Sequence, residues 1–204
     1  MRIVSAEQLQ CWIDGGQVLE RDARGPKVIA LESGLFLKIF YTRRHPLLAR
    51  LQPAAQRFAN NAQSLNARGI MAPQVADLFW IDRGRGLSGC LYEPLPGESV
   101  EQIFCSDAQR GLQLLKSLAV FIRRLHHQGI YFRSLHLGNI LKLPDGNYGL
   151  IDILDLHYKC RPLNRWQIKR NFQHLRDYLK RKQLDNFPIE QLLAFYRLET
   201  DRCE

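Results

Sequence analysis

The sequence lacks a long apolar run and any organised set of cysteines. No stretch approaches roughly 18 consecutive apolar residues, so nothing predicts a membrane-spanning helix. The five cysteines are scattered, without a CxxC pair or a cysteine–histidine pair at zinc-ligand spacing, which argues against a disulfide framework and a structural zinc site. Glu7 and Asp14 lie where a signal peptide would be apolar. These absences predict a cytoplasmic protein.

Glycine and proline are also scarce, at 14 and 9 of 204 residues, and no internal repeat or low-complexity linker is present. Apolar residues make up 46% of the chain, which is enough for a sizeable core and excludes general disorder. The length fits one large domain or two small lobes.

Acidic residues are nearly missing from one segment of this basic chain, whose net charge is +9. The segment 159–182 carries nine Lys and Arg residues against one acid, Asp177. Such a block suits phosphate, anionic lipid or nucleic acid, or it is the solvated face of a helix. Binding to nucleic acid requires aromatic rings that stack on bases. Trp166, Phe172 and Tyr178 lie nearby, but Trp166 and Phe172 fit the packing of the helix itself, so nucleic acid is not favoured.

Short apolar runs broken by turn residues fill the first half of the chain and predict strands. Three runs form a predicted meander, and two more flank a turn at 83–86. A helix is predicted between these two groups. The predicted strands are 17–20, 28–31, 35–41, 74–81 and 87–92, and the helix is 54–68.

The second half has helical periodicity interrupted by one hairpin. Asp107 caps a long helix that ends at Gly129, and the apolar runs 139–143 and 148–151 are joined by a turn at 144–146. A last helix carries an apolar stripe of Ile168, Phe172, Leu175 and Leu179. The chain is therefore predicted to be α+β and two-lobed, with a β-rich lobe over 1–92 and a helical lobe over 93–204.

A polar loop between the long helix and the hairpin carries the clearest chemical signal. Asn139 ends this loop, and Asp152 follows the second strand of the hairpin, so the two side chains are expected to face each other across the mouth of the hairpin. An amide oxygen and a carboxylate, with room for water and phosphate oxygens, suit Mg²⁺ on a nucleotide.

The loop 135–141, Leu-His-Leu-Gly-Asn-Ile-Leu, resembles the catalytic loop of the protein-kinase-like fold, and of aminoglycoside and small-molecule phosphotransferases in particular. The overall layout, including 165–169, is similar to the lipopolysaccharide core heptose kinases of Gram-negative bacteria. The resemblance implies that ATP is the cofactor and that Asn139 and Asp152 bind its Mg²⁺.

The resemblance also assigns Lys38 and the segment that begins at Glu93 to the nucleotide. It implies that Lys38, a lone cation in an apolar strand, contacts the nucleotide phosphates. The alternative for Lys38 is an edge-strand lysine that reaches water. The segment that begins at Glu93 resembles the inter-lobe hinge that meets adenine, or it is a plain connector.

Two departures from the kinase pattern concern the catalytic base and the partner of Lys38. Ser134 stands where the pattern has the catalytic aspartate, which leaves Asp155 and His136 as substitutes. Asp155 also suits a helix or turn cap, which is the role the sequence favours. No acid lies between residues 43 and 77, so Asn61 is either the neutral partner of Lys38 or a buried Asn bonded to backbone.

These residues predict an ATP-dependent phosphotransferase that acts on a lipopolysaccharide core sugar or a related envelope glycan. Positioning and charge neutralisation dominate phosphoryl transfer, so the loss of the aspartate predicts a slow reaction. The alternative is a pseudokinase, a binding or scaffold module that retains the nucleotide site. A lipid-linked sugar acceptor and contact of 159–182 with the anionic inner membrane are the further expectations.

Overall fold

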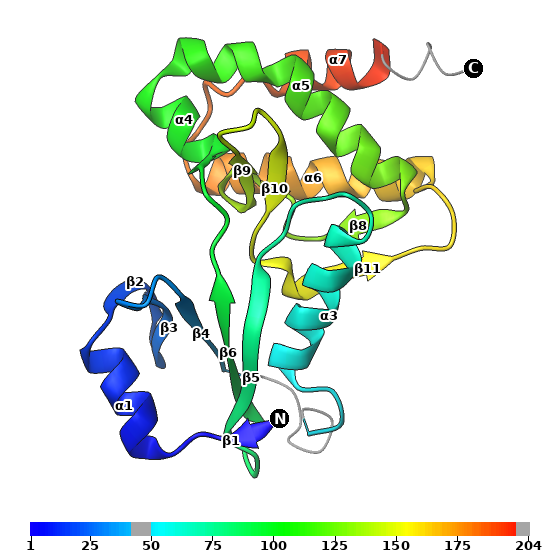
Figure 1. Ribbon diagram of the computed structural model, residues 1–204. Coiled ribbons are helices and arrows are strands. Elements are labelled where there is room, and N and C mark those ends of the chain that lie inside the picture. Colours follow the sequence, from blue (N-terminus) through cyan, green and yellow to red (C-terminus); the bar gives the residue numbers. More distant parts are fainter. Residues whose placement is uncertain (42–49, 199–204) are drawn as a thin grey trace. The chain divides into compact units, whose positions relative to one another are not determined.

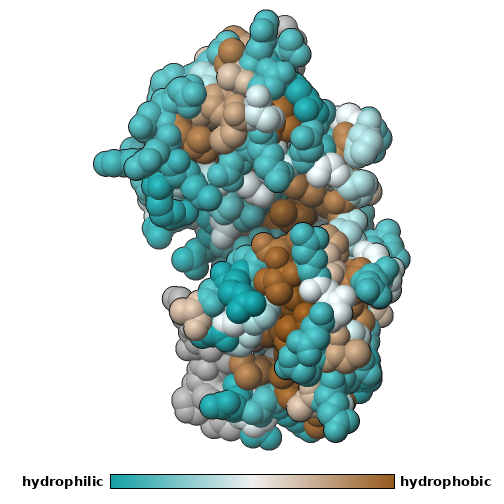
Figure 2. Space-filling view, turned by 90° about the vertical axis from the view of Figure 1, so that its left-hand side faces the viewer, coloured by the Kyte–Doolittle hydropathy of each residue, from teal (hydrophilic) through white to brown (hydrophobic). Residues whose placement is uncertain are grey.

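The computed structural model describes residues 1–41 and 50–198. The chain forms two compact units, Met1–Leu95 and Pro96–Glu204, which are described in turn. The fold is α+β, as predicted from the change of periodicity along the chain. Figure 2 shows one face of the surface, where hydrophilic residues predominate and hydrophobic residues gather in patches.

A six-stranded sheet forms the first unit, in the order β1-β5-β6-β4-β3-β2. All neighbouring strands are antiparallel except β1 and β5. The predicted meander and the later strand pair are both confirmed. The strands are β1 (Arg2–Ile3), β2 (Gln17–Asp22), β3 (Gly25–Ala30), β4 (Phe36–Phe40), β5 (Gln74–Asp82) and β6 (Leu87–Glu93).

Two helices cover opposite faces of this sheet, α1 (Ala6–Asp14) and α3 (Ala54–Asn66) (Figure 1). Side chains alternate along a strand, so β4 supplies both faces. Leu37 and Ile39 join the core cluster on the α1 side, against which Trp12 packs. Phe40 faces α3, where its ring lies 5.6 Å from that of Phe58. The buried residues of α3 are Ala55, Phe58, Ala62 and Leu65.

Helices dominate the second unit. It contains α4 (Val100–Ser106), α5 (Ala108–His127), α6 (Arg165–Arg181) and α7 (Ile189–Leu198), with the 3₁₀ turns η1 (Leu137–Asn139) and η2 (Ile153–Asp155). Two small sheets, β10-β9-β7 and β11-β8, complete it. Their strands are β7 (Glu98–Ser99), β8 (Ile130–Phe132), β9 (Ile140–Lys142), β10 (Tyr148–Leu150) and β11 (Leu156–Tyr158).

Local signals explain the boundaries of α5 and of the predicted hairpin, both of which are confirmed. The carboxylate of Asp107 accepts a hydrogen bond from the Arg110 amide at 2.9 Å and caps α5. Gly129 follows the helix at φ +69°, where a Cβ would lie 2.5 Å from the carbonyl oxygen of Lys159. Gly146 takes φ +86° in the turn that joins β9 and β10.

The stripe predicted on the last helix packs inward, as expected for Phe172, Leu175 and Leu179, while Ile168 is half-buried. The expected packing of Trp166 is wrong: its side chain is 64% exposed. It falls on the solvent side because the buried face of α6 is completed by Asn171 and Tyr178, which the apolar stripe alone did not indicate.

Candidate functional site

The loop before β9 is fixed by its own polar groups. The Asn139 amide N–H donates to the His136 carbonyl at 3.0 Å, which closes the η1 turn. The side-chain nitrogen of Asn139 donates to the Ser134 carbonyl at 3.1 Å, and the residue is buried. Because the amide nitrogen is engaged inside the loop, the amide oxygen is the atom of Asn139 that points away from this bond and can serve a metal ion.

The hairpin brings Asp152 back to Asn139. The pairing of Leu150 with Ile140 continues in a hydrogen bond from the Ile151 amide to the Asn139 carbonyl at 3.0 Å. Asp152 is the next residue, exposed and in the left-handed region at φ +50°. A non-glycine residue in this region is strained, and such strain gathers at binding sites.

The side chains of Asn139 and Asp152 fit a magnesium site in which water and phosphate oxygens supply the remaining ligands. Among the described residues, no group of three or more His, Cys, Asp or Glu side chains could hold a metal. Mg²⁺ on a nucleotide needs fewer protein ligands, because water and phosphate oxygens complete its shell. Asn139 and Asp152 supply one amide oxygen and one carboxylate. Metal binding by this pair stays a prediction.

Ser134 and Asp155 form the most direct contact between two predicted catalytic residues. The Ser134 hydroxyl donates to Asp155 Oδ2 at 2.6 Å. Within the described residues, Asp155 Oδ1 is buried without a hydrogen-bond partner. Burial raises the pKa of the Asp155 carboxyl, the bond from Ser134 lowers it, and the charge of Asp152 raises it further.

The expected cap role does not describe Asp155. Its carboxylate reaches across the loop to Ser134, and the element that follows is the strand β11 rather than a helix. The sequence could not separate the two roles, because Ser134 lies 21 residues earlier in the chain.

His136 points away from this pair and packs against α6. Its ring lies 4.1 Å from that of Tyr178, whose hydroxyl donates to the carboxylate of Glu101 on α4. Burial lowers the pKa of His136, and the charges of Asp152 and Glu101 oppose this shift. The contacts favour a role for His136 in holding the loop. No local sequence pattern indicates that Tyr178 and Glu101 are neighbours of this loop.

In the first unit, Lys38 is buried on an interior strand, so the edge-strand alternative is wrong. It lies on the same side of β4 as Phe40. Its Nζ is 5.3 Å from the ring centroid of Phe58 on α3 and 5.9 Å from that of Phe40. A buried ammonium so placed is costly unless a partner compensates for its lost hydration.

Phe58, Phe40 and Cys90 are among the neighbours of Lys38. Cys90 is its cross-strand neighbour, and burial raises the pKa of that thiol to about 12 against the opposing charge of Lys38. Asn61 is half-buried, one turn after Phe58 on α3. Lys38 and Asn61 each interact with at least one other residue. Pairing between them stays a prediction.

Glu93 is exposed at the end of β6, where it pairs in register with Gln74 of β5. The residues after it lead into the second unit, which begins at Pro96. The prediction that this segment meets adenine remains a prediction.

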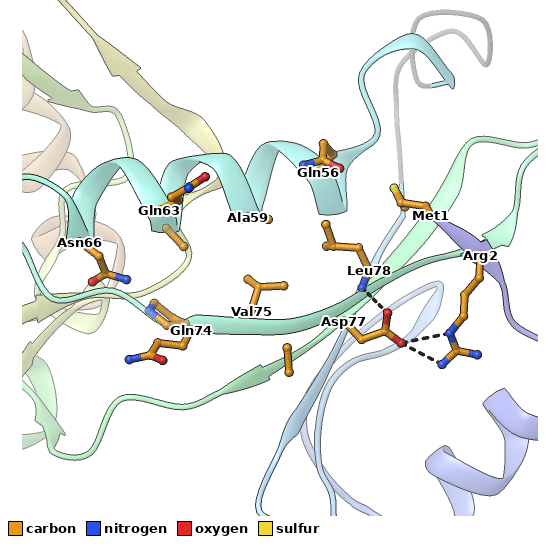
Figure 3. Close-up of a pocket in the computed structure, with 13 residues that line it drawn as sticks. Met1, Arg2, Gln56, Ala59, Gln63, Asn66, Gln74, Val75, Asp77 and Leu78 are labelled. Atoms are coloured by element: carbon orange, nitrogen blue, oxygen red, sulfur yellow. Dashed lines mark hydrogen bonds and ion pairs between the residues drawn. The ribbon is translucent and has the colours of Figure 1, made fainter.

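A cavity of about 630 Å³ lies between α3 and β5 of the first unit (Figure 3). Its lining includes the side chains of Gln56, Gln63 and Gln74, and the ion pair of Arg2 with Asp77 closes one end at 2.8 Å. None of the predicted site residues lines it. This cavity is therefore not the predicted nucleotide site.

The fold defines the class of the protein: it is a kinase-like α+β fold of two units, as predicted. No protein-family model and no curated protein sequence matches the chain. In the described part of the chain, no helix has the length and apolar character needed to cross a membrane.

Two solved structures with this fold are of WbdD. One, a bifunctional kinase-methyltransferase by its description, is 16% identical, with 85% of this chain and 42% of that chain covered and a TM-score of 0.50. A 2.2 Å crystal structure of WbdD is 17% identical, with 85% and 43% covered and a TM-score of 0.49. The chain thus spans less than half the length of WbdD. At this identity the likeness extends to the fold alone.

Proposed function

We propose that the protein is an ATP-dependent phosphotransferase whose acceptor is a hydroxyl of a lipopolysaccharide core sugar or a related envelope glycan. The bond between Ser134 and Asp155, in the loop that ends at Asn139, is the observation that carries the proposal. It brings the Asp155 carboxylate to 2.6 Å from the hydroxyl of Ser134, the residue that stands where the kinase pattern has its aspartate. The kinase fold and the kinase activity in the description of WbdD support the same reaction class.

In this proposal, one set of residues binds the nucleotide and another set accepts the proton of the acceptor hydroxyl. Asn139 and Asp152 hold the metal of the nucleotide, and Lys38 contacts its phosphates. A bound magnesium–ATP complex supplies the phosphoryl group and neutralises its charge. The acceptor oxygen attacks the γ-phosphorus while the bond to the bridging oxygen of ADP breaks. The acceptor proton passes to Ser134 Oγ, and the hydroxyl proton of Ser134 passes to Asp155.

The raised pKa of Asp155 supports its role as the final proton acceptor. A carboxylate with a higher pKa is a stronger base, provided that it remains ionised at the working pH. Serine alone cannot act as a base near neutrality, so the pair is required. The acceptor class rests on the resemblance of the loop and the layout to the heptose kinases.

A pseudokinase is the second candidate, and Ser134 itself favours it. The aspartate of the kinase pattern is replaced, and no acid lies between residues 43 and 77, where the kinase pattern has a glutamate on its helix. A chain of this kind binds nucleotide and does not turn it over. The two candidates share the nucleotide site and differ in phosphoryl transfer.

Thermal denaturation with increasing Mg-ATP tests the shared site. A ligand at about 100 times its Kd stabilises the folded state by about 2.7 kcal/mol, so the melting temperature should rise. Asp152→Asn should remove the magnesium-dependent part of that rise. Asp185→Asn, at an exposed residue of the same unit, is the matched control and should leave the rise unchanged. No rise in the unaltered protein would overturn both candidates.

Transfer of labelled phosphate from ATP to extracted core oligosaccharide then separates the candidates. Labelled oligosaccharide that disappears in Asp155→Asn and persists in Asp185→Asn supports the phosphotransferase. A melting-temperature rise without transfer to any glycan fraction supports the pseudokinase and contradicts the proposed activity.

A further inference from the structure

The outward face of α6 carries an exposed tryptophan. Trp166 is 64% exposed, whereas Trp80 is buried and Trp12 is half-buried against the sheet of the first unit. A large aromatic ring left in water forgoes a substantial gain from burial. The residues beside Trp166 on the helix therefore indicate which kind of partner could contact the ring.

Three exposed cations share the beginning of α6 with Trp166: Arg165, Lys169 and Arg170. The Arg170 guanidinium lies 5.3 Å from the centroid of the Trp166 ring, which holds ring and charge side by side. Residues four apart lie on one side of a helix, so Trp166 and Arg170 share a side, as do Arg165 and Lys169. We call these four residues the α6 patch.

Acidic residues are absent from the sequence around the α6 patch. No Asp or Glu occurs between residues 159 and 176, a stretch that also includes the exposed Lys159 and Arg161. Near the other end of α6, two acidic residues have partners of their own. Asp177 accepts a hydrogen bond from Gln173 at 2.8 Å, and Glu190 of α7 pairs with Arg176 at 2.7 Å. Among the residues that the structure describes, no ion pair is formed by Arg165, Lys169 or Arg170, so their charge is available to a polyanionic partner.

The number of exposed aromatic side chains on α6 decides between two polyanionic partners, a single-stranded nucleic acid and an anionic lipid surface. Proteins that bind single-stranded nucleic acid stack successive bases on several rings. Phe172 and Tyr178 are buried, so Trp166 is the one exposed aromatic side chain that α6 offers. A single exposed tryptophan among cations instead suits contact with a lipid surface, with the ring at headgroup level and the cations on the phosphates.

We propose that the α6 patch docks this protein on an anionic lipid surface. Basic residues near such a surface contribute about 1 kcal/mol each, and the contribution falls with ionic strength. Three cations and one ring give reversible, salt-sensitive binding. The proposal does not depend on phosphotransferase activity, since it concerns a surface of the second unit alone.

Sedimentation of the whole chain with vesicles tests the proposal. Vesicles of phosphatidylcholine alone are compared with vesicles that also contain phosphatidylglycerol, at low and at high salt. The patch variant is Arg165→Glu, Lys169→Glu and Arg170→Glu. The matched control is Arg83→Glu, Arg85→Glu and Lys116→Glu, which changes net charge equally at exposed residues elsewhere.

Binding is expected only to the anionic vesicles and to weaken as salt rises. The patch variant should lose about tenfold or more in apparent affinity, and the control should lose far less. Equal losses in both variants would show a general effect of net charge and overturn the proposal. Equal binding to both kinds of vesicle, or tighter binding to single-stranded RNA than to anionic vesicles, would overturn it too.

Quenching of tryptophan fluorescence tests the contact of Trp166 with lipid directly, because a general effect of net charge would not change it. Brominated lipids quench a tryptophan that enters the headgroup region, and Trp166 is the most exposed of the three tryptophans. Anionic brominated vesicles should quench the unaltered protein, and Trp166→Phe should abolish this quenching. Quenching that survives in Trp166→Phe would place a different surface on the membrane and contradict the proposal.

Discussion

The imidazole of His136 lies flat against the ring of Tyr178, with centroids 4.1 Å and planes 8° apart. The Tyr178 hydroxyl donates to the Glu101 carboxylate, so the loop, α6 and α4 meet at one point. Gly138 fits beneath this contact. A Cβ there would lie 2.6 Å from Glu101 Oε2 and 3.1 Å from the Tyr178 hydroxyl oxygen.

Gly138→Ala should therefore destabilise the fold by about 1–3 kcal/mol, because the added methyl group displaces the contact between Tyr178 and Glu101. Urea unfolding followed by far-UV circular dichroism measures the change. Gly84→Ala is the control, since its Cβ would meet only the side-chain oxygen of Asp82 in an exposed turn, at 3.2 Å. Equal free energies of unfolding of the two variants would show that Tyr178 and Glu101 make room for the methyl group without loss of stability.

His126 is buried in a network that fixes its neutral form. Asn171 donates from Nδ2 to the Phe132 carbonyl, so its Oδ1 faces the imidazole and accepts from Nε2 at 2.9 Å. The other ring nitrogen lies 2.8 Å from the Tyr196 hydroxyl, which donates to it. Burial lowers the pKa of His126 to about 4, against a smaller rise from the bond to Asn171.

The pKa of His126 predicts a loss of stability in acid. Between the unfolded value of about 6.5 and the folded value of about 4, the unfolded chain binds the extra proton, so the free energy of unfolding rises with pH in this window. The loss as pH falls through the window should reach about 3 kcal/mol.

Urea unfolding at several pH values measures this dependence. His126→Gln should flatten it, while His157→Gln, at an exposed histidine, should leave it as in the unaltered protein. A steep dependence that persists in His126→Gln would assign the effect to other groups.

The sequence predicted those parts of the fold that local signals define. The cap of Asp107, the turn at Gly146 and the apolar stripe of α6 each depend on neighbours within a few residues. The helix α1 was not predicted, although Ser5 caps it and Leu9, Trp12 and Ile13 recur at helical spacing. It spans only nine residues, and none of them is fully buried. The strand β7 has two residues and pairs with β9, some 43 residues away, which no local pattern reveals.

The geometry of the candidate site could be predicted from the sequence only where it is local, and the roles of its residues stay predictions. Asn139 and Asp152 belong to one hairpin, so the turn brings them together. Tyr178 lies 77 residues from Glu101, and the network of His126 and Asn171 spans 45 residues. These pairings depend on how helices pack, which periodicity alone does not specify. The exposure of Trp166 was missed because a polar residue, Asn171, takes part of the buried face of α6.

Lys38→Met should separate folding from nucleotide binding. Methionine keeps the apolar stem of the side chain beside Phe58 and removes the ammonium group, and the melting temperature without nucleotide measures what this change costs the fold. The rise produced by Mg-ATP should be lost, because the phosphates lose their cation. Lys27→Met, which removes a partly exposed lysine of β3 paired with Glu20, is the control and should keep the Mg-ATP effect. An undiminished effect of Mg-ATP in Lys38→Met would exclude Lys38 from the nucleotide site.

Ser134 and Asp155 should act as one unit in phosphoryl transfer. Removal of a proton acceptor typically costs about 10²–10⁴-fold in rate, so Asp155→Asn should lower the rate of transfer within that range. Ser134→Ala should lower it by a similar factor, because Asp155 then has no hydroxyl through which to receive the proton. The double variant should be no slower than the slower single variant, since residues that work together are not additive. Steady-state rates of the four proteins with saturating Mg-ATP measure the coupling, and the Mg-ATP thermal shift of each variant shows that its nucleotide site is intact. Multiplicative losses in the double variant, or an unchanged rate in Ser134→Ala, would show that Asp155 does not receive the proton through Ser134.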